Sequence, residues 1–271
     1  MLFFLTTQPL WVSGTILVVL TTALAMVGPI VVRRYVGLEK LAAHNEIAGF
    51  KFATIGVLYA ALLAFATIVV WQRFSDAEAA VVQEAGAAAT IYRVLPGIGE
   101  KPAAELQGAL SKYLIAAIEN DWPAMDRGSA RPSPASRAAL DAVYSALLTF
   151  EPTRQGDVVL VAEILRQLDV ITQARETRLI AAAGVVPNVI WSVLFGGGIL
   201  AVIFTFFFGT ENLRAQTLMT GMLSILIFSE LLTIVVIDRP FSGPVKVGPE
   251  ALVYVLTEFA PESRGAVRPG D

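Results

Sequence analysis

The sequence contains no cysteine and only one histidine. The absence of cysteine excludes disulfides, thiolate metal ligands and cysteine nucleophiles. The single histidine, His44, has no cluster of carboxylates around it in the sequence, so a plain loop position is expected and no metal site or cofactor is predicted. The motifs of a Walker lysine loop, a nucleophile elbow and a zinc-binding HExxH helix are also missing. We therefore predict that the chain is not an enzyme.

Charge is scarce as well. Only 16% of the 271 residues are charged and 55% are hydrophobic, whereas soluble domains carry about a quarter charged residues. The net charge is −3, and the surplus lies between Arg73 and Val186, which hold 11 basic and 14 acidic residues. No basic tract is present, so a nucleic acid is not expected as a partner. The apolar excess instead indicates a lipid bilayer.

Four long apolar runs account for that excess. Each has about the 20 residues that a helix needs to cross the hydrocarbon core, and a helix satisfies its own backbone there. The connections within the first pair and the second pair are short, so we predict two antiparallel hairpins. Lys and Arg are balanced on the two sides, so the sequence sets no orientation. The runs are Leu10–Val32, Phe52–Trp71, Val189–Phe208 and Leu218–Ile237.

A helical extramembrane region is predicted between the two hairpins. Its composition favours helices, Pro and Gly clusters separate them, and no run alternates with period two. Asp121-Trp122-Pro123 is expected to end one helix, and Asp157 is expected to cap another. The predicted helices are 73–94, 102–120, 134–150, 157–183 and, near the C-terminus, 249–259. The fold class is therefore all-α, divided into a first hairpin (1–72), the extramembrane region (73–186), a second hairpin (187–240) and a C-terminal turn with a short amphipathic helix (241–271).

The second run carries small residues at helical spacing. Gly56, Ala60, Ala64 and Thr67 follow one another at intervals of three and four, so they share one face of a helix. In lipid, helices associate where small residues allow close backbone approach. Tight helix packing is one interpretation of this stripe. The other is that it faces a pore or a subunit axis, where an apolar constriction would gate by dewetting.

Polar residues inside or beside the last two runs are further candidates. Glu230 lies within the fourth run, where a carboxylate is costly, so it is either a protonated or hydrogen-bonded structural group or an ion or proton site. Asp238, Arg239 and Pro240 follow that run, and we expect them to fix the helix end and the next turn at the interface. Gly196–Gly198 interrupt the third run, and close packing is the favoured interpretation.

Six short motifs are spread along the chain: Asn45–Phe50, Gly56–Ala60, Trp71, Phe74–Ala79, Asp121–Pro123 and Asp238–Gly243. In combination they resemble the bacterial bestrophin-like family of membrane proteins. The name of that family implies a distant likeness to bestrophins, which are pentameric chloride channels with cytosolic helical domains and a pore lined by the second span. The resemblance therefore implies that Gly56, Ala60, Ala64 and Thr67 lie near a pore.

Two functional hypotheses follow from the residues and the resemblance. The first is a homo-oligomeric ion channel of the inner (plasma) membrane that passes an inorganic ion, with anion selectivity suggested by the resemblance. The second is a non-conducting multi-pass scaffold or sensor whose helical region binds a protein partner. A proton-coupled transporter that depends on Glu230 is a weaker third option, because only one ionisable residue is buried in the spans.

Overall fold

The computed structural model describes residues 8–259, and within this range the chain is entirely helical, without a strand. Four of the helices are long and apolar enough to cross a membrane: Leu10–Tyr35, Asn45–Ile98, Asn188–Thr205 and Leu213–Ile237. This confirms the prediction of an all-α polytopic membrane protein. The chain divides into two compact units, which are described separately below.

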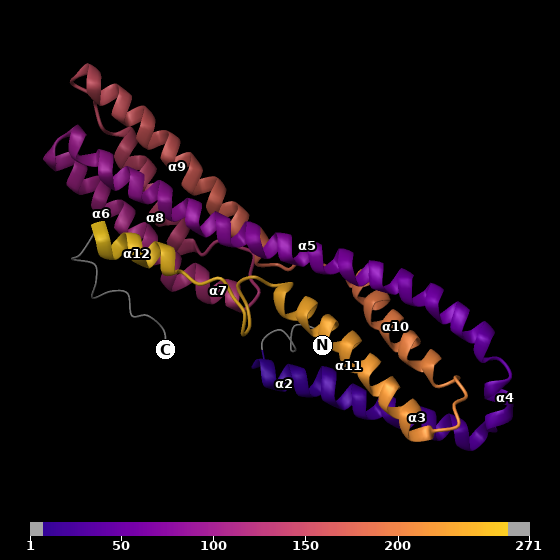
Figure 1. The fold of residues 1–271 in the computed structure, drawn as a ribbon. Helices are drawn as coiled ribbons and strands as arrows, with labels where there is room; N and C mark the ends of the chain where they lie inside the picture. The colour runs from indigo at the N-terminus through magenta and orange to yellow at the C-terminus, as the bar shows by residue number, and fades with distance from the viewer. Residues whose placement is uncertain (1–7, 260–271) are drawn as a thin grey trace. The chain divides into compact units, whose positions relative to one another are not determined.

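The membrane unit comprises Met1–Gln72 and Val185–Asp238. Its first span is continuous and takes in a short π-helical segment, and the third span, α10, and the fourth, α11, are joined by a short loop. Helix α11 packs along the first span and against α10 (Figure 1). The elements are α2 (Leu10–Gly14), η1 (Thr15–Leu20), α3 (Thr21–Tyr35), α4 (Leu38–Ala42), the first half of α5 (Asn45–Val94), α10 (Asn188–Thr205) and α11 (Leu213–Ile237).

Side-chain to backbone hydrogen bonds fasten the two short loops of the membrane unit to each other. The Asn45 side chain donates to the carbonyl of Gly209 at 2.6 Å and accepts from the Gly209 N–H at 2.9 Å. Arg33 donates to the carbonyls of Thr210 and Glu211, both at 3.1 Å. A Cβ at Gly209 would collide with the backbone of α4, so only glycine fits this approach. The loops therefore form one packed surface at this end of the spans.

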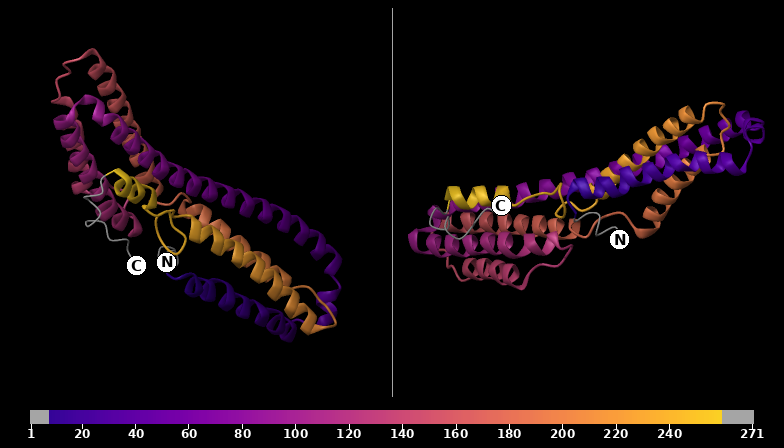
Figure 2. Two further views of the ribbon diagram at one scale, coloured as in Figure 1. Left: turned by 60° about the vertical axis from the view of Figure 1, so that its left-hand side comes forward. Right: turned by 90° about the horizontal axis from the view of Figure 1, so that it is seen from below.

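The helical unit comprises Arg73–Gly184 and Arg239–Asp271. The second half of α5 contributes one of its long helices, and a continuous apolar cluster fills the space between the helices. Helix α12 packs against α6, as two further views show (Figure 2). The remaining elements are η2 (Leu95–Ile98), α6 (Glu100–Ala116), η3 (Ala117–Asp121), α7 (Trp122–Asp126), α8 (Pro134–Leu148), α9 (Gln155–Ala181) and α12 (Glu250–Phe259).

Two helix boundaries differ from the sequence expectation. The chain does not leave the helical conformation before Pro123: a π-helical segment leads directly into α7, with Asp121 and Trp122 in right-handed helical geometry. Pro123 lies in the first turn of α7, directly after the π-helical segment. Asp157 is not the N-cap of α9, because the helix begins two residues earlier, after Arg154. Instead, its carboxylate accepts from the N–H of Arg154 at 3.0 Å in a capping box.

Candidate functional site in the membrane unit

Helix α5 presents three distinct faces along its membrane half. One face is buried against the rest of the membrane unit and consists of Tyr59, Leu63, Ala66 and Val70. The small-residue stripe predicted from the sequence lies roughly 90° around the helix from this buried face, as 3.6 residues per turn requires. Large apolar side chains follow on the far side of the stripe and are well exposed: Val57, Phe65 and Ile68.

The stripe has little cover from its own chain. Ala60 and Ala64 are exposed, and among the described residues nothing lies within 4 Å of a Cβ added at Gly56. Thr67, the fourth member, is half-buried. Small side chains on a membrane helix leave its backbone open to close approach. The stripe is therefore available to a neighbouring copy of the chain or to an axial path.

The structure brings together two of the candidates, Thr67 and Glu230. Thr67 Oγ1 lies 2.6 Å from Glu230 Oε1 and 2.9 Å from the carbonyl oxygen of Leu63. A threonine hydroxyl has one hydrogen and can donate only one hydrogen bond at a time. If it donates to Leu63, the contact with Glu230 is a hydrogen bond only when the carboxyl group is the donor. The half-buried Glu230 is thus joined to the edge of the stripe, 163 residues away in sequence.

Tyr59 anchors the buried face of α5, a role that the sequence analysis did not identify. Its hydroxyl donates to the carbonyl of Leu194 at 2.8 Å, and its ring lies where a Cβ at Gly197 would be, at 2.7 Å. Gly197 belongs to the three-glycine run that was predicted to serve packing. That run lies within the continuous helix α10, so the missing side chain admits the tyrosine ring. An aromatic residue in the second apolar run and consecutive glycines in the third were the features of the sequence that could have indicated this contact.

Asp238, Arg239 and Pro240 lie at the end of α11 and in the turn that follows. The Asp238 carboxylate accepts from the backbone N–H groups of Val185 and Val186, at 3.1 and 3.0 Å. Asp238 thus ties the end of the fourth span to the chain entering the third. The carbonyl of Pro240 accepts from Val247 at 2.7 Å and that of Arg239 from Ser242 at 3.1 Å, and both bonds shape the turn. Neither arrangement resembles a ligand site.

A buried network of charged residues in the helical unit was missed altogether. Arg178 Nε donates to Glu84 Oε2 at 2.8 Å, Tyr113 donates to Glu84 Oε1 at 2.6 Å, and Arg178 also lies 3.6 Å from the Asp121 carboxylate. Arg175 joins it by donating to Ser136 Oγ at 2.6 Å. Among the described residues, no buried side-chain polar atom in the chain lacks a partner.

Burial and charge act together on the ionisation of this network. Burial raises the pKa of Tyr113 well above its ordinary value, and the adjacent Glu84 carboxylate raises it further. For Arg178, burial by itself would lower the pKa, but Glu84, Tyr113 and Asp121 together outweigh burial and the pKa is raised. The arginine is therefore a fixed positive charge at the centre of the network.

A signal for the network existed in the sequence. Glu84 falls in register with the apolar stripe of α5, and Arg175 and Arg178 fall in register with that of α9. Charged residues at such core positions are rarely buried unless they are paired. The apolar members of the two stripes are Ala77, Val81, Ala88 and Ile91 on α5, and Ile164, Leu168 and Ile171 on α9.

No clustered metal ligands occur in the part of the chain that the structure describes, where no group of three or more His, Cys, Asp or Glu residues could hold an ion. His44 lines a cavity at the short-loop end of the membrane unit. The arrangement around α5 offers a hydroxyl, a carboxyl group and an exposed small-residue surface.

The comparisons with known proteins agree with this fold. The family model of the Bestrophin-like domain matches residues 19–252 of the chain. A crystal structure of a bacterial bestrophin homologue from Klebsiella pneumoniae with a leucine-to-threonine substitution superposes with a TM-score of 0.71 at 13% identity, over 91% of this chain and 99% of that chain. A second crystal structure of the Klebsiella pneumoniae homologue, with an isoleucine-to-threonine substitution, has a TM-score of 0.71 at 13% identity, over 89% and 98%.

A further solved structure, described as a membrane protein with a glycine-to-alanine substitution, has a TM-score of 0.69 at 16% identity, over 90% of this chain and 97% of that chain. At these identities the likeness to the solved structures shows the fold alone. No curated protein matches the sequence significantly.

Proposed function

Because this chain belongs to the bestrophin-like family, we propose that copies of it assemble around a common axis into an ion channel of the bacterial inner membrane. The family is one of channels rather than enzymes. In the proposed assembly the small-residue stripe of α5 faces the axis, and the large apolar side chains beyond it face lipid or a neighbouring subunit. Anions are the ions that the family likeness suggests.

The observation that carries the proposal is the exposed stripe itself. Exposed alanines at positions 60 and 64 and the open space at Gly56 leave one face of a membrane helix with no cover from its own chain. Ordinary packing within one chain would cover such a face. A ring of copies would use it either as a close contact or as the wall of a narrow apolar path.

Conductance of the purified protein in planar bilayers, under asymmetric chloride salts, tests the proposal. We expect discrete currents with a reversal potential near that of chloride. Ala64→Leu adds bulk to the stripe and should change the unitary current. The matched control is Ala61→Leu, because Ala61 is exposed on α5 outside the stripe, and its current should equal that of the wild type.

The contrary results are equally definite. If neither Ala64→Leu nor Ala61→Leu changes the unitary current, the stripe does not line the pore. A reversal potential that follows the cation would overturn the anion assignment but keep the channel. Silence from correctly assembled protein under every voltage and salt would favour the second candidate.

That second candidate is a non-conducting scaffold or sensor whose helical unit binds a protein partner. Exposed apolar side chains on the helical unit favour it: Leu148 on α8 is 71% exposed, and Val158 and Val159 on α9 are 57% and 69% exposed. The test is copurification of the non-conducting protein with a defined partner. The double variant Val158→Asp with Val159→Asp should abolish that copurification. The two candidates are separated because a scaffold tolerates any oligomeric state, whereas a pore requires a ring.

A further inference from the structure

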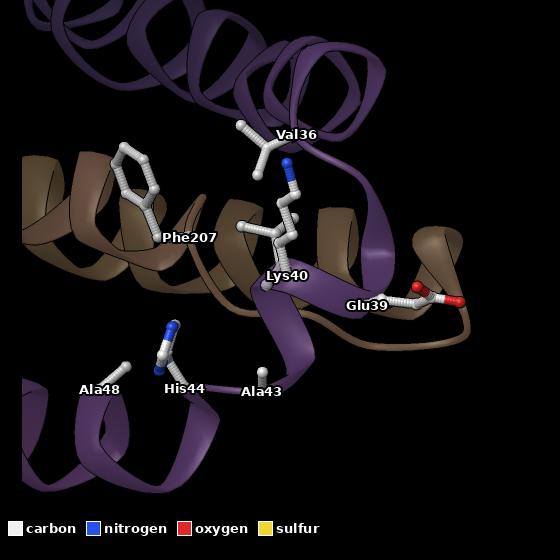
Figure 3. Close-up of a pocket in the computed structure, with 8 residues that line it drawn as sticks. Val36, Glu39, Lys40, Ala43, His44, Ala48 and Phe207 are labelled. Carbon is white, nitrogen blue, oxygen red and sulfur yellow. The ribbon is translucent and has the colours of Figure 1, made fainter.

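A cavity of about 610 Å³ opens at the short-loop end of the membrane unit (Figure 3). It lies between the end of the first span, α4, the start of α5 and the end of the third span. Its walls are mostly apolar, and three ionisable side chains also contribute to the lining. The lining residues are Val36, Glu39, Lys40, Leu41, Ala43, His44, Ala48 and Phe207.

The cavity lies at the level where membrane helices meet the lipid headgroups. The first span ends at Tyr35 and the third at Thr205, and the cavity residues directly follow these ends. Aromatic side chains near these helix ends are well exposed: Tyr35 by 85%, Phe50 by 78% and Phe207 by 51%. Tyrosine is typical of the membrane–water interface, and Tyr35 is the last residue of the first span.

The charged side chains at the cavity are one cation, Lys40, and one carboxylate, Glu39. Figure 3 shows the His44 imidazole turned toward the space below Phe207, the Lys40 side chain extending past Val36, and the Glu39 carboxylate directed away from both. Lys40 is exposed, and its ammonium group has no ion pair or side-chain hydrogen bond with any other described residue. An ammonium on a long aliphatic stem reaches a headgroup while its methylenes cover apolar surface.

The cavity also has a firm frame. The hydrogen bonds between Asn45 and Gly209, at 2.6 and 2.9 Å, hold the loop after Phe207 against the chain that follows α4. Arg33 is not among the lining residues, and its guanidinium group donates to the carbonyls of Thr210 and Glu211. Lys40 is therefore the cation in the cavity wall that remains for a ligand.

We propose that this cavity binds one anionic phospholipid of the surrounding bilayer. The phosphate group lies between the Lys40 ammonium and His44, and the upper part of an acyl chain lies against Phe207 and the other apolar wall residues. The combination of an apolar wall, an unpaired cation and an interfacial position fits a lipid better than a soluble anion. Basic pockets between membrane helices bind lipid headgroups in the same way.

Equilibrium binding to the purified protein in detergent micelles tests this assignment. The probes are fluorescent phosphatidylglycerol and phosphatidylcholine with identical acyl chains. We expect saturable, tighter binding of phosphatidylglycerol, weakened about fivefold by Lys40→Gln, as the loss of one lysine near a headgroup predicts. Ala48→Trp fills the cavity without a change of charge and should abolish binding of both lipids. Lys51→Gln, at an exposed lysine outside the cavity lining, should have no effect.

Three results would overturn the proposal. Equal affinity for the two lipids would show that the cavity does not recognise the anionic headgroup. Equal losses in Lys40→Gln and Lys51→Gln would show only general surface charge. Displacement of the lipid by glycerol 3-phosphate at a concentration comparable to that of the lipid would show a site for a free phosphate ester, in which the acyl chain contributes nothing.

Discussion

Glu84 and Glu230 lie in very different surroundings, although both are acidic residues on long helices. Glu84 is fully buried and accepts hydrogen bonds from Arg178 at 2.8 and 3.2 Å. Glu230 is half-buried in the membrane unit beside a single hydroxyl, that of Thr67. Glu84 is held by a full positive charge, whereas the partner of Glu230 within residues 8–259 is a neutral hydroxyl. Substitutions at the two residues should therefore affect different properties of the protein.

Removal of Arg178 should destabilise the helical unit strongly. Arg178→Met leaves the Glu84 carboxylate buried without its charged partner, and breaking such a pair costs about 3–5 kcal/mol. For a chain of this size, a loss of that order lowers the melting temperature by roughly 6 °C or more. Thermal unfolding followed by intrinsic fluorescence measures the change.

The control for this prediction is Arg166→Met. Arg166 also pairs with a carboxylate, that of Glu163, at 2.7 Å, but its side chain is 64% exposed. Exposed pairs contribute little, so the melting temperature should hardly move. Similar shifts in the two variants would mean that the buried network does not stabilise the unit as its geometry indicates.

The hydrogen bond between Glu230 and Thr67 should affect the current of the proposed channel. Glu230→Leu removes the partner of Thr67 Oγ1 at the edge of the stripe and should change the unitary current, whereas Glu230→Gln keeps a side-chain oxygen that accepts in the same place and should conduct like the wild type. Single-channel recordings in planar bilayers compare the two variants. Glu211→Gln in the exposed loop is the control, and a wild-type current in Glu230→Leu would exclude a role of this hydrogen bond in conduction.

At the scale of elements, the contact between α5 and α10 depends on glycine at two positions of the three-glycine run. A Cβ at Gly197 would lie 2.7 Å from two ring atoms of Tyr59 and one at Gly198 would lie 2.8 Å from its hydroxyl oxygen, whereas one at Gly196 would meet no described atom within 4 Å. Gly196 and Gly197 are adjacent in sequence but lie on different sides of α10. Substituting each of them with alanine therefore separates the effect on packing from the effect on helix propensity.

Gly197→Ala should destabilise the membrane unit, because the ring of Tyr59 must move and its hydrogen bond to Leu194 is strained. Gly196→Ala should be neutral or stabilising, since alanine favours a helix over glycine by about 1 kcal/mol. Thermal unfolding in the same detergent compares the two variants. Equal melting temperatures would show that α5 and α10 do not meet as closely as the structure has them.

Helix α5 shows what periodicity in the sequence can and cannot predict. The spacing of Gly56, Ala60 and Ala64 places them on one face of a helix, because periodicity is a local property, and α5 is helical over these positions. It did not reveal that Tyr59 and Leu63 occupy the face that packs within the chain. Residues suited to close packing occur on the stripe and on the buried face. Composition alone therefore did not show which of these two faces packs within the chain.

At the scale of the whole molecule, the proposed function predicts that a single chain does not form the channel by itself. The exposed alanines of α5 need either lipid or another copy beside them. A pore with a stripe from each copy around its wall requires a closed ring.

The protein purified in mild detergent should therefore have one discrete mass that is a multiple of the 29.0 kDa chain. Light scattering coupled to size exclusion, with the detergent contribution subtracted, measures that mass. Ala60→Leu combined with Ala64→Leu should shift or broaden the distribution, and Ala61→Leu should not. A monomer that is stable at all protein concentrations would rule out an axial pore.

The sequence by itself determined the helical class and the four membrane-spanning segments of this protein. These properties follow from local composition. A run of about 20 apolar residues is long enough to cross the bilayer, and as a helix it forms all of its backbone hydrogen bonds within itself. It also marked Glu230 as a costly carboxyl group, because hydrophobic neighbours in sequence are enough to show that.

Only the tertiary structure decided which groups meet. Glu84 and Arg178 are 94 residues apart in sequence and Thr67 and Glu230 are 163 apart, and no local pattern pairs such residues. The cavity that exposes Lys40 likewise depends on residues from both short loops. Charge pairing, burial and cavity shape depend on distances in space, and packing of several helices sets those distances.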